Sequence, residues 1–224
     1  MFIAHFGAGL AAKGIDRKPS LGTLFLASQF IDLLWPLFLI IGIEKVSIDP
    51  GNTVVTPLNF YYYPFSHSLM GVIFWSILFG GIYYLLKKRL KTSLILGVLV
   101  LSHWVLDLLV HRPDLPLTTS NEYMLGLSGW NSIVITLLLE FGIFFAGAYL
   151  YLKYTNSTNR KGTVLIWSLL IFLVIIYLTN ILGPPPPEAE AIGYVGLSQW
   201  LIVGWGYWAD RNRSAVGVLV NTKT

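Results

Sequence analysis

The chain has 224 residues, of which 55% are hydrophobic and 12% are charged. A soluble domain usually carries about 25% charged residues, so this composition predicts a multi-pass membrane protein. The sequence contains no cysteine, which excludes disulfides, thiolate metal sites and cysteine nucleophiles. The net charge of +4 is modest and does not indicate binding to nucleic acid.

The N-terminal segment, residues 1–12, is apolar but shorter than the roughly 20 residues that cross a bilayer. Its first basic residue is Lys13, whereas a signal peptide begins with positive charge. We therefore expect the segment to be retained, either as a half-helix between the spans or as an interfacial helix. On a helix, His5 lies about 12 Å from Lys13 along the axis.

Six later segments are long enough to cross a bilayer, at roughly 20 residues each. Their approximate bounds are 22–43, 66–86, 92–111, 130–152, 163–183 and 191–209. Basic residues cluster at 13–18, 87–91, 153–161 and 211–213, which all fall on one side if both termini are cytoplasmic. The sequence thus predicts one all-α integral membrane domain over 1–224. This domain would have about six spans plus the N-terminal half-helix, in the cytoplasmic (inner) membrane with both termini cytoplasmic.

The first span places an aspartate at mid-depth. Asp32 lies in the string QFIDLLWP, about 15 Å from the expected cytoplasmic end. Pro36 cannot donate a hydrogen bond to the Asp32 carbonyl, so we expect a kink there. A carboxylate at this depth usually faces a partner, a cavity or a metal.

The second span begins with YPFSHSL, which combines a helix start with a histidine. Pro64 is expected near the first helical position. His67 then falls in the first turn, where the helix dipole favours the neutral imidazole that metals require. Free amides and the Ser66 hydroxyl would suit a phosphate, which makes Ser66 a candidate for substrate binding, although capping alone also explains it.

The third span contains SHWVLDLLVHRPD, in which His103, Asp107 and His111 recur every fourth residue. Helical geometry places them on one face, where they can chelate a cation or hydrogen-bond to one another. His103 lies about 16 Å from the cytoplasmic end. Pro113 should end the helix near His111, which leaves Arg112 at an outer mouth where it can meet an anion.

Fewer candidates lie further along the chain. Glu140 is central in the fourth span, where it could orient a ligand or form an interhelical hydrogen bond. GPPPPE, residues 183–188, predicts a stiff extended turn. The candidates for proton transfer are His111, Asp114 and Glu140.

The order of these motifs resembles a family of membrane-bound, metal-dependent hydrolases of bacteria, which is distantly similar to zinc-dependent phospholipase C. MFIAH, QFIDLLWP, FSHS and SHWVLD carry the resemblance, which covers residues 1–117, while 118–224 contribute further spans. LLW follows Asp32 where the family has a second acidic residue and a histidine. The resemblance implies one cation or a carboxylate-bridged pair, with the ligands His5, Asp32, His67, His103 and Asp107.

These patterns predict a membrane-embedded hydrolase that uses zinc, or alternatively manganese, and acts on a phosphoester or lipid substrate. A transporter or channel that uses the same groups as a proton or cation pathway is the alternative, although no inverted repeat is visible. A scaffold whose polar residues only join helices explains four histidines poorly. For the hydrolase, all five ligands must converge, yet Asp107 should lie about 6 Å further out than His103.

Overall fold

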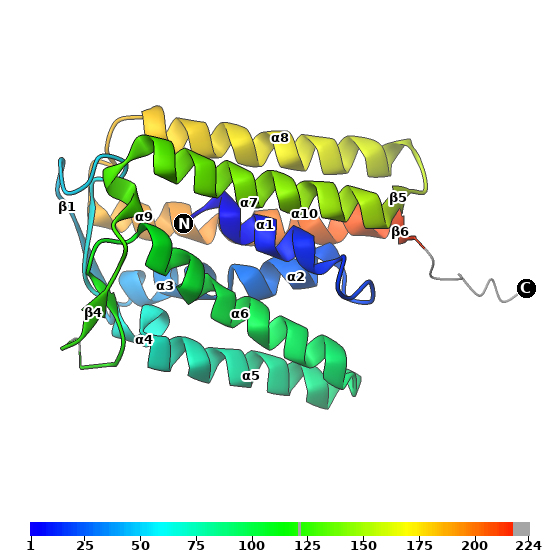
Figure 1. The fold of residues 1–224 in the computed structure, drawn as a ribbon, viewed down its shortest axis with the longest axis horizontal. Helices are drawn as coiled ribbons and strands as arrows, with labels where there is room; N and C mark the ends of the chain where they lie inside the picture. Colours follow the sequence, from blue (N-terminus) through cyan, green and yellow to red (C-terminus); the bar gives the residue numbers. More distant parts are fainter. Residues whose placement is uncertain (121, 217–224) are drawn as a thin grey trace, which may run out of the picture.

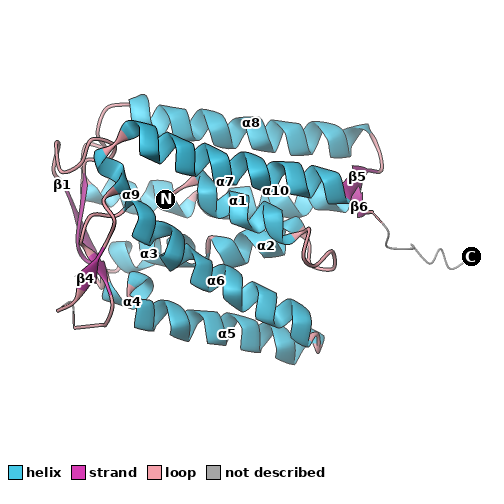
Figure 2. Ribbon diagram, viewed as in Figure 1, coloured by secondary structure: helices cyan, strands magenta, loops and turns pink. Residues whose placement is uncertain are grey.

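The computed structural model describes residues 1–120 and 122–216, which form an all-α fold (Figure 1; Figure 2). The α-helices are α1 (Ile3–Ala12), α2 (Leu21–Ser28), α3 (Phe30–Ile40), α4 (Pro64–His67), α5 (Leu69–Lys87), α6 (Leu90–Val110), α7 (Ile133–Tyr154), α8 (Arg160–Leu182), α9 (Ala189–Leu197) and α10 (Gln199–Arg211). A 3-10 turn, η1 (Gly129–Asn131), precedes α7. Antiparallel pairs join β1 (Lys45–Ile48) to β2 (Leu58–Tyr62), β3 (Leu115–Pro116) to β4 (Met124–Leu125) and β5 (Thr155–Ser157) to β6 (Arg213–Ala215).

Four helices, α5, α6, α7 and α8, are long and apolar enough to cross a membrane. α2 and α3 pass the same test together, with a bend of 56° between them, which gives up to five candidate spans in the described part of the chain. Helices of this length and composition indicate a membrane protein. The sixth expected span, 191–209, is divided between α9 and α10 around Ser198, so the count of six is not reached by this criterion.

The first span bends at Gln29, and not at Pro36 as expected. α3 starts after Gln29 with Asp32 in its first turn, and Pro36 lies inside this helix. The proline ring packs instead against α9, where a Cβ on Gly196 would lie 3.0 Å from the Pro36 Cβ. Pro36 therefore serves a helix contact, while the break at Gln29 sets the direction from which Asp32 enters the site.

α1 is a half-helix in the middle of the bundle, not an interfacial one. Its Ile3, His5, Phe6 and Leu10 are fully buried. It packs against α7, α2 and α6, and Figure 1 shows it between α7 and α6. The apolar core around it is shared by α2, α7, α8 and α10. A chain segment too short to cross a membrane thus carries His5 deep into the fold.

The two ends of the bundle differ in charge. The turn after α1, the α5–α6 turn and the β5–β6 pair lie at one end (Figure 1), and they carry the basic clusters of the sequence. We call this the basic end. The β1–β2 and β3–β4 pairs and the proline-rich loop between α8 and α9 lie at the opposite end, which we call the site end.

Candidate metal centre

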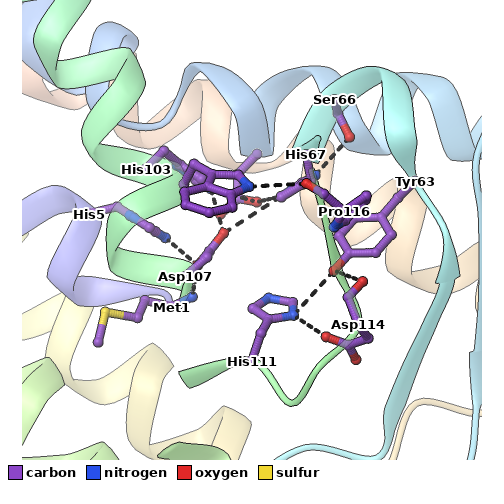
Figure 3. Close-up of polar contacts among 12 residues, drawn as sticks. Met1, His5, Tyr63, Ser66, His67, His103, Asp107, His111, Asp114 and Pro116 are labelled. Carbon is purple, nitrogen blue, oxygen red and sulfur yellow. Dashed lines mark hydrogen bonds and ion pairs between the residues drawn. The ribbon is translucent and has the colours of Figure 1, made fainter. Parts of the chain in front are cut away.

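The five residues selected from the sequence as ligands lie together at the site end. They come from α1, α3, α4 and α6, and Figure 3 shows four of them facing one another. Two overlapping groups have ligand atoms within 4.8 Å of one another: His5 with His103 and Asp107, and Asp32 with His67 and His103. His103 and Asp107 stay one turn apart on the unbroken α6, and their side chains bridge the expected depth difference, with Nε2 and Oδ2 3.3 Å apart. The bend at Gln29 and the break between α4 and α5 at Ser68 set the positions of Asp32 and His67.

Two of the histidines, His103 and His67, each lie close to both carboxylates. His103 Nε2 lies 3.5 Å from Asp32 Oδ1 and 3.3 Å from Asp107 Oδ2. His67 Nε2 lies 3.5 Å from the same Asp32 oxygen and 3.9 Å from the same Asp107 oxygen. Tetrahedral zinc ligands at about 2.0–2.2 Å from the metal are themselves roughly 3.3–3.6 Å apart. Each histidine nitrogen therefore lies at, or slightly beyond, this spacing from both carboxylates, whereas Asp32 and Asp107 fall in different groups of mutually close ligand atoms.

His5 lies on the other oxygen of the Asp107 carboxylate. Its Nε2 is 3.1 Å from Oδ1, which also contacts the amino group of Met1. The His5 ring stacks on His103 with centroids 3.7 Å apart and planes 7° apart. From this position His5 can orient Asp107 for one cation, or bind a second cation bridged by the same carboxylate.

The hydrogen bonding of His103 shows that the residues fit a cation. Its Nδ1 lies 3.0 Å from the Ser28 carbonyl oxygen, which can only accept, so Nδ1 carries the proton. In the neutral ring, Nε2 is then an unprotonated, buried atom without a hydrogen-bond partner, placed between two carboxylates. This arrangement requires positive charge at Nε2, either a metal or, without one, a second ring proton.

His67 is held by a residue that the sequence analysis missed. The buried Glu44 carboxylate accepts the backbone N–H groups of Phe65 and Ser66 at 2.8 and 2.7 Å and the Ser66 hydroxyl at 2.5 Å. Since Ser66 Oγ gives its proton to Glu44, it accepts one from His67 Nδ1, 2.7 Å away. His67 Nε2 is left unprotonated toward the site. Burial raises the pKa of the Glu44 carboxyl, while the hydrogen bonds from Ser66 and Phe65 oppose that shift.

Glu44 stands in the sequence as an ordinary polar residue after the first span. Only the loop that runs from α3 into β1 brings it beside α4. Ser66, predicted to bind substrate, has its hydroxyl engaged by Glu44 and His67 and does not line the cavity described below.

His111, Asp114 and Arg112 form a separate group next to the ligands. His111 Nδ1 lies 2.9 Å from Asp114 Oδ1, and Tyr63 Oη is 3.3 Å from the same nitrogen. Arg112 donates to Asp114 Oδ2 at 3.1 Å and to the Asn59 side chain at 2.7 Å. His111 lines the cavity, whereas Arg112 and Asp114 do not, so the arginine expected at the mouth is directed to its neighbours.

Glu140 is buried and lines the cavity, but its oxygens are occupied. It accepts the backbone N–H groups of Phe2 and Ala4, each at 2.8 Å. Amides at the start of a helix have no partner within the helix, so Glu140 satisfies the beginning of α1. Its observed contacts therefore position α1 and, through it, His5.

A cavity of about 620 Å³ leads from these residues to the surface at the site end. Asp32, His67, Asp107 and His111 line its inner part. The loop 50–58 and the prolines 184–187 cover it, and α8, α9 and α10 form a side wall. Comparison with protein-family models, curated proteins and solved structures finds no match to this chain.

Proposed function

We propose that this chain is a membrane-embedded, metal-dependent hydrolase that acts on a phosphoester, as the resemblance in its motifs implies. The observation that carries the proposal is the convergence of unprotonated histidine nitrogens and carboxylates at one buried point. An unpaired charge at the centre of a bilayer costs at least about 2.5–3.5 kcal/mol, and in the described part of the chain the Met1 amino group contacts the carboxylate of Asp107 but not that of Asp32. A divalent cation would compensate both carboxylates at once. The nitrogen and oxygen donor set suits zinc, with manganese as the alternative.

The residues divide the chemistry among them. A bound divalent metal would polarise a phosphoryl oxygen and make water a better nucleophile. Asp32, His67, His103 and Asp107 would hold it. His111 lies further along the cavity wall with Nδ1 on Asp114, so its other nitrogen is available to exchange a proton with water or the leaving group.

We infer that the site end faces outward and that the basic end, with the turn after α1 and the β5–β6 pair, faces the cytoplasm in the inner membrane. The expected cytoplasmic N-terminus is not compatible with the position of the Met1 amino group on Asp107 inside the bundle. Four basic clusters at one end of the bundle favour that end as the cytoplasmic side. In this arrangement α2–α3, α5, α6, α7, α8 and α9–α10 make six crossings. The cavity then opens toward the outer face of the membrane.

The same geometry argues against a proton or cation pathway through the protein. The residues that line the cavity all lie in the half of the bundle at the site end. Between His5 and Lys13, α1 is enclosed by fully buried apolar side chains, including Phe6, Leu10 and Phe25. A site open on one side fits an enzyme better than a conduit.

Metal analysis of the purified full-length chain tests the proposal. Wild type should hold about one zinc or manganese ion per chain in a tetrahedral site. His103→Ala should lose it, because Nε2 lies beside both carboxylates. His111→Ala is the matched control: it removes a buried histidine of the same region, outside the ligand groups, and should keep the metal. A metal-free wild type, or equal metal in His103→Ala, would overturn the proposal.

A further inference from the structure

We propose that the side of the cavity formed by α8, α9 and α10 holds the alkyl chain of a lipid phosphoester whose phosphate lies at the metal centre. The placement of the phosphate at the metal centre rests on the proposed function. The site proposed for the alkyl chain rests on separate observations, and all but one of them, at Trp35, come from residues beyond the part of the sequence that carries the family resemblance.

The side wall of the cavity carries aliphatic side chains from three helices, among polar ones. α9 packs against α3, and α8 packs against α10. Ile176 of α8, Ile192 and Val195 of α9, and Ile202 of α10 all line the cavity. The cavity therefore separates α8 from α9, with aliphatic side chains on both sides, and is continuous with Asp32 and Asp107 at its inner part.

This side of the cavity reaches the outer surface of the bundle. Val195 lines the cavity and is 69% exposed. The apolar side chains of Leu182 and Leu201, at the end of α8 and the start of α10, are also exposed. In a membrane such a surface faces lipid. The position of Val195 thus offers an alkyl chain a lateral route from the bilayer.

Three buried polar atoms of cavity-lining side chains have no hydrogen-bond partner among the described residues. They are Tyr177 Oη, Gln199 Oε1 and Trp35 Nε1. A buried polar group left unpaired costs about 1–3 kcal/mol. All three atoms are closed off from the empty cavity, so the hydroxyl and ester oxygens between a lipid phosphate and its chain would pair with them once these side chains turn toward the ligand, whereas a pure hydrocarbon would leave them unpaired.

The size of the cavity agrees with part of one lipid molecule. Pockets of about 300–1,000 Å³ hold a ligand of drug size, and this cavity measures about 620 Å³. It has room for a glycerol phosphate and the first part of one chain. The remainder would lie beyond Val195, in the bilayer.

The test uses two probes that share a headgroup: oleoyl lysophosphatidic acid and glycerol 3-phosphate. Val195→Trp, which fills the lateral opening, should weaken binding of the lysophosphatidic acid by about tenfold or more, equivalent to 1.4 kcal/mol. Binding of glycerol 3-phosphate should stay unchanged. Leu201→Trp is the matched control, since Leu201 is 76% exposed and does not line the cavity, and it should affect neither probe.

A second variant separates ligand binding from folding. Tyr177→Phe removes a hydroxyl that has no hydrogen-bond partner among the described residues, so the unfolding temperature without ligand should stay the same or rise. Binding of the lysophosphatidic acid should weaken by about threefold or more, because one hydrogen bond contributes about 0.5–1.5 kcal/mol. Unchanged binding in both Val195→Trp and Tyr177→Phe would overturn the alkyl-chain site.

Zinc content, measured on the same samples, separates the two proposals. If wild type holds no zinc but binds the lysophosphatidic acid through Val195, the hydrolase proposal fails and the lipid site stands. If wild type holds zinc but binds both probes equally well, the lipid site fails and the hydrolase proposal stands.

Discussion

At the scale of single residues, hydrogen bonds at Nδ1 set the tautomer and the ring orientation of the two histidines between the carboxylates. His103 donates from Nδ1 to the Ser28 carbonyl, and His67 donates from Nδ1 to Ser66, whose hydroxyl is held by Glu44. Both arrangements place the proton away from the site and leave Nε2 free. Metal affinity should therefore depend on Ser66 and Glu44, although neither is a ligand.

Ser66→Ala should lower zinc affinity by about 10–100-fold, because His67 loses the partner that sets its tautomer and ring orientation. Competition with a chelator measures the change. Ser102→Ala is the control, since Ser102 precedes His103 as Ser66 precedes His67 but donates only to the Leu99 carbonyl. Equal zinc affinity in Ser66→Ala and wild type would show that the hydrogen bond does not position the ligand.

The ligand candidates could be predicted from the sequence because each stands in a short motif within or beside an apolar run. Glu44 could not, because its role arises only where the loop after α3 folds back onto α4. Arg112 has neighbours that its position in the sequence does not suggest. Its place after the third span predicts an anion site, and in the structure Asp114 and Asn59 accept hydrogen bonds from its Nε and Nη2.

At the scale of elements, α1 determines whether His5 reaches the site. It approaches α7 through a pair of glycines, and a Cβ on Gly147 would lie 2.9 Å from the Gly7 Cα. The sequence predicts a short apolar helix but not its place, because an interfacial helix has the same composition. The placement follows from the small residues of two helices 140 positions apart and from Glu140, which accepts the first amides of α1.

Gly147→Ala should destabilise the protein by about 1–3 kcal/mol, because the added methyl group overpacks the α1–α7 contact. Gly142→Ala, on the same helix, is the matched control, since a Cβ there has no heavy atom within 4 Å. It should be neutral or stabilising by up to about 1 kcal/mol from helix propensity. Thermal unfolding in detergent compares the two variants, and equal unfolding temperatures would mean that α1 does not depend on this close approach.

At the scale of the whole molecule, the length and charge pattern of the sequence predict the all-α class and the position of most helices. They do not predict the breaks at Gln29 and Ser198, because the polar Ser-Gln pair at each position is also compatible with one continuous helix. The break at Ser198 accompanies a packing contact. Pro36 of α3 packs against Gly196 of α9, and α9 ends just after this contact, before α10 begins. The same two breaks shape the cavity wall that α9 and α10 contribute.

The membrane orientation can be tested with reporter fusions at three loops. A fusion at Gly162, at the start of α8 on the basic end, should report the cytoplasm, because basic loops stay inside. Fusions at Pro185 and at Gly51, both on the site end and both exposed, should report the exterior. Opposite results at Gly162 and Pro185 would reverse the orientation of the metal centre.

A fourth fusion, at Arg213, tests whether α9 and α10 together cross the membrane. α8 runs from the basic end to the site end, and β6 pairs with β5 back at the basic end. The chain between them must therefore return across the bundle, although neither α9 nor α10 is long enough to span alone. Arg213 should report the same side as Gly162. A report from the same side as Pro185 would place α9 and α10 outside the membrane and leave the side wall of the cavity without lipid beside it.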